Sequence, residues 1–193
     1  MKTALSVAAL AVLTACGPLA AVLGPRGGAP QQVEVSLDAL TAPTLQVTVP
    51  SLGQSGEMRL IGVNDDVQTW AVDDLVSLSL RQGVLVSTRG FGHDLMGADA
   101  QPTLDALQGF APDVYRRKSR YLTGDNHSVW VTAGCSMADV GMVDGLRQFE
   151  ETCEARNDRF TNQFGLDRSG RIARARQWVS PQLGYVETDL RTQ

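Results

Sequence analysis

The sequence contains few of the residues from which metal, nucleotide and nucleic-acid sites are built. Its 193 residues include three cysteines and two histidines, without the ligand spacing of a metal site. It also lacks a glycine-rich phosphate loop and a serine nucleophile elbow. The formal net charge of −4 leaves no large basic surplus, which argues against nucleic acid as a partner. These absences predict a protein without a metal or a cofactor.

Long apolar runs are missing except at the amino terminus. Past Cys16 no run approaches the roughly eighteen apolar residues that suggest a membrane-spanning helix. At the amino terminus, Lys2 precedes an apolar stretch at residues 4–13, which at about ten residues is too short to span a bilayer. The stretch therefore predicts a cleaved signal peptide over residues 1–15. Loss of Lys2 with that peptide would change the formal charge from −4 to −5.

Residues 13–16 at the end of the predicted signal peptide read Leu-Thr-Ala-Cys, which fits the bacterial lipobox pattern. In such a sequence the cysteine thiol is acylated and the preceding peptide bond is cut, so the mature chain is expected to begin at Cys16. Two or more acyl chains anchor a protein stably, whereas one does so only marginally. We therefore expect Cys16 to hold the protein on a bilayer outside the cytoplasm, and Gly17 at the next position favours the outer membrane. An ordinary signal peptide with a coincidental cysteine is the alternative.

Cys135 and Cys153 remain once Cys16 carries lipid. An even pair of cysteines in an oxidising compartment predicts a disulfide. That bond would close a loop of about 19 residues and contribute ~3 kcal/mol by the chain-entropy model. Two free thiols are the alternative, because sequence alone does not show whether the two Cα atoms approach within bonding distance.

The mature chain has the length of a single domain. Residues 16–32 hold the lipidated cysteine followed by glycine, proline and alanine with one charge, Arg26, and predict a flexible tether. Residues 33–193 then form one domain, and the hydrophobic content of 43% is sufficient for a packed core.

Short alternating segments separated by glycine-containing turns predict an all-β fold with a mainly antiparallel sheet, either a sandwich or an open, barrel-like sheet. Single strands are expected at residues 45–49, 58–63 and 67–72. Hairpins are expected from the pairs 76–80 with 84–88, 121–123 with 128–133, and 160–167 with 171–179.

Two segments show helical spacing. Leu104, Leu107 and Phe110 predict one short helix over residues 102–110, with Thr103 as its N-cap. Residues 146–155 are ambiguous, because their apolar residues also fit one face of a helix, whereas their position between strands favours a strand. The fold is therefore expected to contain one or two short helices.

Four segments, in this order along the chain, resemble the YjbF/GfcB lipoproteins of bacterial exopolysaccharide and group 4 capsule loci. The similarity covers residues 63–190, most of the mature chain, and the lipobox at Cys16 agrees with it. The segments are Thr69-Trp70 leading to Thr-Arg-Gly-Phe-Gly-His-Asp-Leu at 88–95, Phe-Glu-Glu-Thr-Cys at 149–153, Phe-Thr-Asn-Gln-Phe-Gly-Leu-Asp at 160–167, and the strand at 170–181.

The resemblance implies an all-β, outer-membrane lipoprotein encoded beside exopolysaccharide export genes. It also implies a partner, an outer-membrane β-barrel of the YjbH/GfcD type. The favoured function is a non-enzymatic accessory factor in exopolysaccharide or capsule secretion that binds a partner or a glycan. The alternatives are a periplasmic polysaccharide hydrolase or lyase, and a structural envelope lipoprotein without a glycan role.

The sequence contains no convincing catalytic constellation. His93 and Asp94 follow a glycine-rich turn close to Ser87, but adjacent residues on a strand point in opposite directions, which does not suit a base and its orienting acid. His127 lies in a polar turn and is expected to be solvated. A hydrogen-bonded turn histidine is the simpler interpretation of His93.

Two sets of residues are candidates for contacts with a partner. Aromatic side chains on predicted strands would stack on sugar rings if they faced solvent, or would fill the core; they are Trp70, Tyr121, Trp130 and Trp178. This acidic chain has one dense basic run, which consists of Arg116, Arg117, Lys118 and Arg120. The run is either a solvated loop or an exposed basic edge. As an exposed edge it would contact an acidic polysaccharide or phosphate-rich lipid head groups.

Overall fold

The structure is a computed structural model that describes residues 42–73, 75–125 and 127–192. The chain divides into two units, Met1–Ser36 and Leu37–Gln193. The first unit lies outside the described residues. The predicted signal peptide (1–15), the lipidated Cys16 and the tether (16–32) are therefore outside the described part of the chain.

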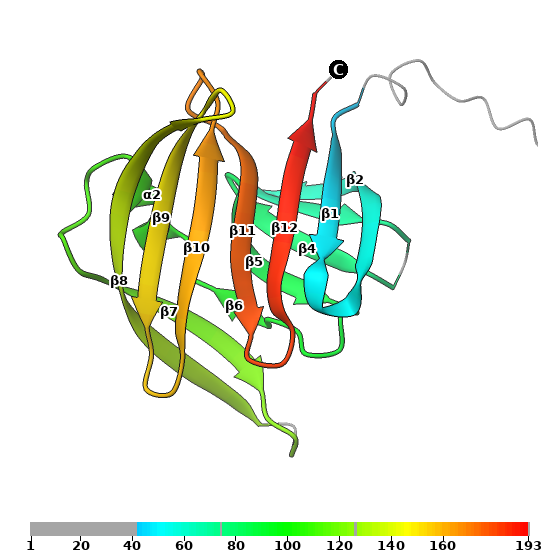
Figure 1. The fold of residues 1–193 in the computed structure, drawn as a ribbon. Helices are drawn as coiled ribbons and strands as arrows, with labels where there is room; N and C mark the ends of the chain where they lie inside the picture. Colours follow the sequence, from blue (N-terminus) through cyan, green and yellow to red (C-terminus); the bar gives the residue numbers. More distant parts are fainter. Residues whose placement is uncertain (1–41, 74, 126, 193) are drawn as a thin grey trace, which may run out of the picture. The chain divides into compact units, whose positions relative to one another are not determined.

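One antiparallel sheet makes up the second unit (Figure 1). Its strands follow the order β5-β4-β3-β2-β1-β12-β11-β10-β9-β8-β7-β6. In the amino-terminal half the strands are β1 (Thr44–Val49), β2 (Gln54–Asn64), β3 (Val67–Ala71), β4 (Ser77–Arg81), β5 (Val84–Arg89) and β6 (Gly97–Ala98). In the carboxyl-terminal half they are β7 (Tyr115–Leu122), β8 (Ser128–Val143), β9 (Leu146–Glu154), β10 (Arg159–Leu166), β11 (Ile172–Ser180) and β12 (Gly184–Arg191).

The predicted all-β, mainly antiparallel fold is confirmed, and two short helices accompany the sheet in the described part of the chain. The 3-10 helix η2 (Pro50–Leu52) joins β1 to β2, and α2 (Gln101–Leu107) follows β6. The helix predicted at 102–110 is thus confirmed, but it ends at Leu107. The prediction of Thr103 as its N-cap is wrong: Ala100 is the N-cap, and Thr103 lies inside the helix with its hydroxyl donating to Glu151. The ambiguous residues 146–155 form the strand β9 rather than a helix.

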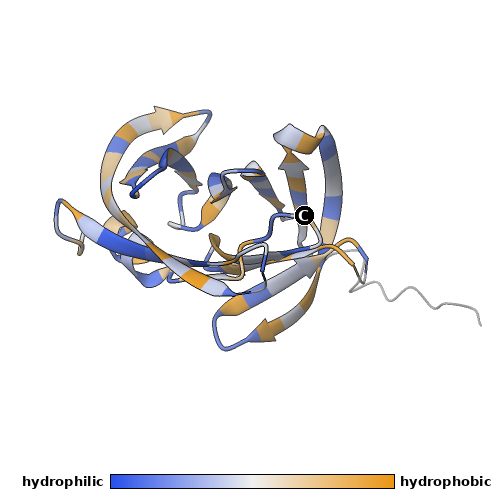
Figure 2. Cartoon of the chain, turned by 90° about the horizontal axis from the view of Figure 1, so that it is seen from below, coloured by the Kyte–Doolittle hydropathy of each residue, from blue (hydrophilic) through white to orange (hydrophobic). Residues whose placement is uncertain are grey.

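Alternation of buried and more exposed residues sets which face of each strand points inward. In β1, Leu45, Val47 and Val49 are buried, and the residues between them are half-buried. Figure 2 shows the same alternation of hydrophobic and hydrophilic residues along the strands. Because side chains of a strand point alternately to its two faces, this pattern gives the sheet one apolar face.

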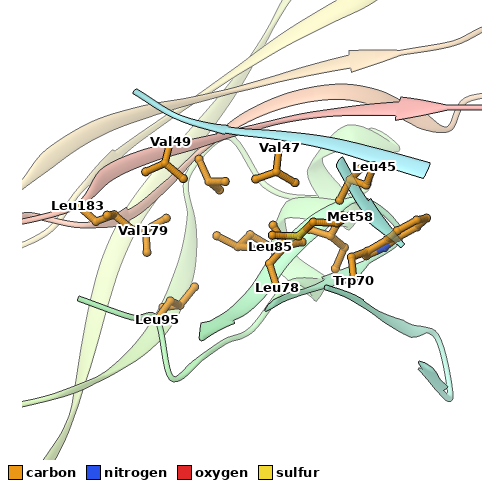
Figure 3. Packing of buried hydrophobic residues seen from close by; sticks show 12 residues of the cluster. Leu45, Val47, Val49, Met58, Trp70, Leu78, Leu85, Leu95, Val179 and Leu183 are labelled. Atoms are coloured by element: carbon orange, nitrogen blue, oxygen red, sulfur yellow. The ribbon is translucent and has the colours of Figure 1, made fainter. Parts of the chain in front are cut away.

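The apolar side chains gather into separate clusters along the inner face. The largest cluster packs β1 against the hairpins of the amino-terminal half, and Figure 3 shows side chains of β1 directed toward Leu78 and Leu85. A second cluster lies around α2, with Leu104 packed near Phe164 of β10 and Ile172 of β11. A third surrounds Cys135 and Cys153.

The two ends of the sheet meet, so that it forms a nearly closed, barrel-like sheet. The backbone N–H of Thr88 in β5 donates to the carbonyl of Leu95 at 2.9 Å, and the N–H of Leu95 donates to Thr88 Oγ1 at 2.9 Å. Directly after this link, the N–H of Met96 donates to the carbonyl of Arg120 in β7. The segment around β6 therefore connects the edge strand β5 to the other end of the sheet.

Candidate functional site

The basic run of residues 116–120 lies on β7 and is divided between the two faces of that strand. Arg116, Lys118 and Arg120 point outward and are exposed. Arg117 points inward and is only 4% exposed. The expectation of a single exposed edge of four cations is therefore wrong for Arg117, because successive residues of a strand face opposite ways.

Arg116, Lys118 and Arg120 form no ion pair with any of the described residues. Several other exposed arginines of the sheet have carboxylate partners: Arg147 pairs with Asp139 at 2.7 Å, for example. The cations of β7 thus carry positive charge that neighbouring residues do not neutralise.

An exposed aromatic ring lies beside these cations. Trp130 of β8 is in register with Arg120, is 61% exposed, and has the guanidinium carbon of Arg120 at 6.0 Å from its ring centroid. Gly134 is in register with Arg116, so no bulky side chain covers that end of the strand. We call Arg116, Lys118, Arg120 and Trp130 the basic-aromatic face.

The other three aromatic candidates do not present a free ring to solvent. Trp70 is 1% exposed and belongs to the core, which excludes it as a glycan platform. Tyr121 is half-buried and packs against the largest core cluster, and burial raises the pKa of its phenol. Trp178 is half-buried between Phe160, with which it stacks at a centroid distance of 5.4 Å, and Tyr185, which meets it edge-on. Of the four rings, Trp130 alone is exposed.

Inside the sheet, a fully buried carboxylate collects four hydrogen-bond donors. Glu151 Oε1 accepts from Thr103 Oγ1 at 2.6 Å and from Tyr115 OH at 2.7 Å. Its Oε2 accepts from Arg117 Nη1 at 2.7 Å and from Asn162 Nδ2 at 2.6 Å. We call these five residues the Glu151 cluster. It links α2, β7, β9 and β10 through side chains.

The surroundings of Glu151 favour its charged form. Burial by itself would raise the pKa of the carboxyl group, but the Arg117 charge and the hydrogen bonds from Thr103, Asn162 and Tyr115 outweigh burial and lower that pKa. Burial and the negative charge of Glu151 raise the pKa of Tyr115 far above its ordinary value. Each carboxylate oxygen accepts two hydrogen bonds, an arrangement that favours a structural support over a reactive acid.

A second set of buried side chains occupies the open edge of β5. Gln177 of β11 accepts from the N–H of Leu85 at 2.8 Å and donates to the carbonyl of Gly83 at 2.9 Å. Arg117 Nη2 approaches the carbonyl of Leu85 at 3.5 Å. Backbone groups that an edge strand would leave unpaired are thereby bonded to side chains.

The predicted disulfide between Cys135 and Cys153 is present. The two residues face each other in the register of β8 and β9, with their Cα atoms 4.1 Å apart. Together with Glu151 they form a close group of three residues whose side chains are of types that can bind metals. Both sulfurs are bonded to each other and the carboxylate is held by four donors, so this group offers no free ligand atom.

The residues considered for catalysis have local structural roles. The carboxylate of Asp94 accepts from Thr88 Oγ1 at 2.8 Å and from the N–H groups of Gly90 and Phe91, so it shapes the turn after β5. His93 is exposed, and its backbone carbonyl accepts a hydrogen bond from a serine of β11. His127 pairs with Asp125 in an exposed turn. Ser87 is in register with Ser79 on β4, and its side chain forms no hydrogen bond to a histidine within the described part of the chain.

Sequence reasoning found the cations and Trp130 but not the Glu151 cluster. Its members are spread over residues 103–162 and show no motif spacing. The sequence holds one weak indication of this cluster. Arg117, Glu151 and Asn162 are charged or amide residues at strand positions where the alternating pattern would place an apolar side chain. Among the described residues, no helix has the length and apolar character needed to cross a membrane.

Comparisons with known proteins agree with the fold and with the resemblance to a lipoprotein family. The sequence profile of the family described as "Group 4 capsule polysaccharide lipoprotein gfcB, YjbF" matches residues 20–190. None of the curated proteins matches. A crystal structure of the hypothetical lipoprotein YmcC from Escherichia coli (K12) is similar, with a TM-score of 0.65 and 20% sequence identity. The match covers 79% of this chain and 85% of the YmcC chain, and at this identity it shows the fold alone.

Proposed function

The chain belongs to the YjbF family of group 4 capsule polysaccharide lipoproteins, and we propose that it is a non-enzymatic accessory factor of capsule or exopolysaccharide secretion that binds an acidic polysaccharide through its basic-aromatic face. The family supports a role in capsule or exopolysaccharide production. The direct contact with the glycan is inferred from the exposed cations of β7.

Three unpaired cations on one strand face are the observation that carries the proposal. Alternate residues of a strand are about 7 Å apart, so Arg116, Lys118 and Arg120 form a row of positive charges along β7. A polymer with a carboxylate on successive sugars presents a matching row of negative charges. Trp130 at the end of the row adds an exposed ring, which suits stacking on a sugar.

The proposal includes the membrane anchor and a partner protein. Acylation of Cys16 would hold the domain at the periplasmic surface of the outer membrane, where the polysaccharide leaves the cell. The resemblance to YjbF/GfcB proteins adds an outer-membrane barrel of the YjbH/GfcD type as the export partner. In this arrangement the lipoprotein holds the acidic polymer near the barrel and does not cleave it.

Removal of the three outward charges tests the contact. The variant Arg116→Gln, Lys118→Gln, Arg120→Gln leaves Arg117 in place, since Arg117 is buried against Glu151. We expect its unfolding free energy to change by less than about 1 kcal/mol per charge, as for other exposed charges. Its affinity for the acidic polysaccharide secreted by the same cell should fall at least tenfold, and polysaccharide output should decrease. The matched control removes three exposed, ion-paired cations, Arg147, Arg159 and Arg174.

Raised ionic strength and replacement of Trp130 test the cations and the aromatic ring of the basic-aromatic face separately. Binding of the wild type should weaken as ionic strength rises from about 0.15 M to 1 M, because the Debye length falls from about 8 Å to 3 Å. Trp130→Ala should lower affinity without changing this salt dependence. Normal affinity and normal output of the triple variant would refute the contact. Shortening of the polysaccharide by the wild type, abolished by His93→Ala, would instead favour a hydrolase or lyase.

A further inference from the structure

The interior of the sheet is not filled at one end. A cavity of about 530 Å³ lies between the largest core cluster and the cluster around α2. Its walls include Leu45, Trp70 and Leu80 from the first cluster, and Leu104 and Ile172 from the second. Barrels of about eight strands are just filled by their own side chains or hold one small ligand, and wider ones enclose more space. The twelve-stranded sheet accordingly leaves room that its side chains do not occupy.

The cavity changes from apolar to polar between its walls and its rim. The buried residues that line it are apolar apart from Thr188, which is 6% exposed. The exposed residues that line it are predominantly polar or charged, among them Asp65, Gln82, Gln108 and Arg171. An occupant with an apolar body and a polar end would match both zones.

Charged residues at the rim are largely neutralised within the protein. Asp66 lines the cavity and pairs with Arg81 at 2.6 Å. Arg171 also lines the cavity and pairs with Asp167 at 3.1 Å. The rim therefore offers no unpartnered cations of the kind found on β7, which makes the cavity a poor site for a segment of an acidic polysaccharide.

We propose that this cavity binds an acyl chain, with the hydrocarbon against the buried walls and the polar end at the rim. Its volume falls within the range of about 300–1,000 Å³ that is usual for small-ligand pockets, and barrel mouths are common places for them. A sugar would leave its hydroxyl groups against leucine and isoleucine side chains, where each unpaired hydroxyl loses its hydrogen bonds to water. An acyl chain carries no such groups in its body.

Two sources could supply the acyl chain. One is a fatty acid or lipid of the membrane. The other is the lipid expected on Cys16, which carries acyl chains of the same chemistry. The site itself is independent of the polysaccharide contact on β7, so either proposal can fail without the other.

Filling the cavity from two sides tests the site. The full chain carrying Cys16→Ser is titrated with cis-parinaric acid, whose fluorescence rises in an apolar site. We expect saturable binding with one acid per chain. Two lining residues, Ala173 of β11 and Gln68 of β3, are half-buried, and Ala173→Phe and Gln68→Phe should each weaken binding at least tenfold. Ala138→Phe, at an exposed position of β8 away from the cavity, should leave binding unchanged.

Photo-crosslinking on the unmutated cavity identifies the source and does not depend on a variant that folds. A diazirine fatty acid is added to the membrane-bound wild type and to the Cys16→Ser chain, and the labelled peptides are mapped. Labelling around Leu104 and Ile172 in both proteins assigns the site to a lipid supplied from the membrane. Labelling there in Cys16→Ser alone assigns it to the chain's own lipid. Absence of labelling at these residues, or parinaric acid binding that neither phenylalanine variant weakens, would overturn the proposal.

Discussion

Replacement of Glu151 by glutamine should be among the most destabilising conservative changes in this protein. Glutamine keeps one carbonyl oxygen but turns the other acceptor into an NH₂ donor, while the four donors around Glu151 remain. The two donors that bonded the replaced oxygen then face the NH₂ group of glutamine. In addition, the buried Arg117 loses the negative charge of the carboxylate that lies 2.7 Å from its guanidinium in the wild type. Breaking a buried ion pair by removing one partner costs about 3–5 kcal/mol, and we expect a loss of this size.

A double-mutant cycle separates the pair from the rest of the cluster. Arg117→Met should also destabilise strongly, since it leaves the Glu151 carboxylate buried without its cation. The double variant should cost at least 1 kcal/mol less than the sum of the two single variants, because it removes both charges together. Arg147→Met breaks the exposed pair with Asp139 and serves as the control, with an expected cost below about 1 kcal/mol.

The pH dependence of stability gives an independent signature of the same carboxylate. The pKa of Glu151 is lower in the folded protein than its ordinary value. Its contribution to stability is therefore complete above the unfolded pKa of about 4.3 and is lost as the pH falls toward the lower folded pKa. Urea unfolding followed by tryptophan emission should show a steeper loss of stability below about pH 4.5 for wild type than for Glu151→Gln. A variant within 1 kcal/mol of wild type, or one with the same acid profile, would refute this reasoning.

Two further changes test the turn geometry and the crosslink. Gly83→Ala should destabilise the protein by more than about 1 kcal/mol in urea unfolding, because Gly83 has a φ of +88° and an added Cβ would lie 2.6 Å from Ile172 Cβ. Gly53→Ala is the control and should cost less, since an added Cβ there has nothing within 4 Å. Equal losses of stability would contradict the steric argument. Replacing Cys135 and Cys153 together by alanine should cost ~3 kcal/mol by the loop-entropy model, and an unchanged midpoint of thermal unfolding would contradict this.

The hairpins closed by a glycine could be predicted from the sequence, because their local pattern is sufficient. The hairpin of β4 and β5 has apolar residues alternating on both sides of Gly83, and the structure forms this hairpin, with Leu78 in register with Thr88. In the same way the turn at Gly170 joins β10 to β11. Short-range chemistry determines these elements, and the sequence displays it directly.

Strands whose inward positions are polar could not be recognised so easily. Arg117 occupies an inward position of β7, so the basic run showed no apolar alternation and was open to interpretation as a loop. Glu151 likewise occupies an inward position of β9, so residues 146–155 showed no clear strand alternation and a helix remained an alternative there. Gln177 interrupts the apolar positions of β11. Each of these side chains is satisfied by partners far away in the sequence, and such partners leave no local signal.

The strand β12 (Gly184–Arg191) was not predicted either. Pro181 marks the end of the preceding strand, and the buried positions of β12 include a threonine, Thr188, beside the apolar Val186. Only the pairing of β12 with both β1 and β11 makes this strand evident. The basic-aromatic face likewise required the register of β7 with β8, which placed Trp130 beside Arg120.

The bonds from Gln177 to the edge of β5 have a kinetic consequence. They join residues 92 and 94 positions apart in the chain, whereas most neighbouring strands of the sheet pair through short turns. Closing a long loop carries an entropy cost that must be met before the contact stabilises anything. We therefore expect the hairpins to form early and the seam between β5 and β11 to close late in folding. A newly exported chain would then pass through an open sheet, with its apolar face uncovered, before the molecule reaches its final form.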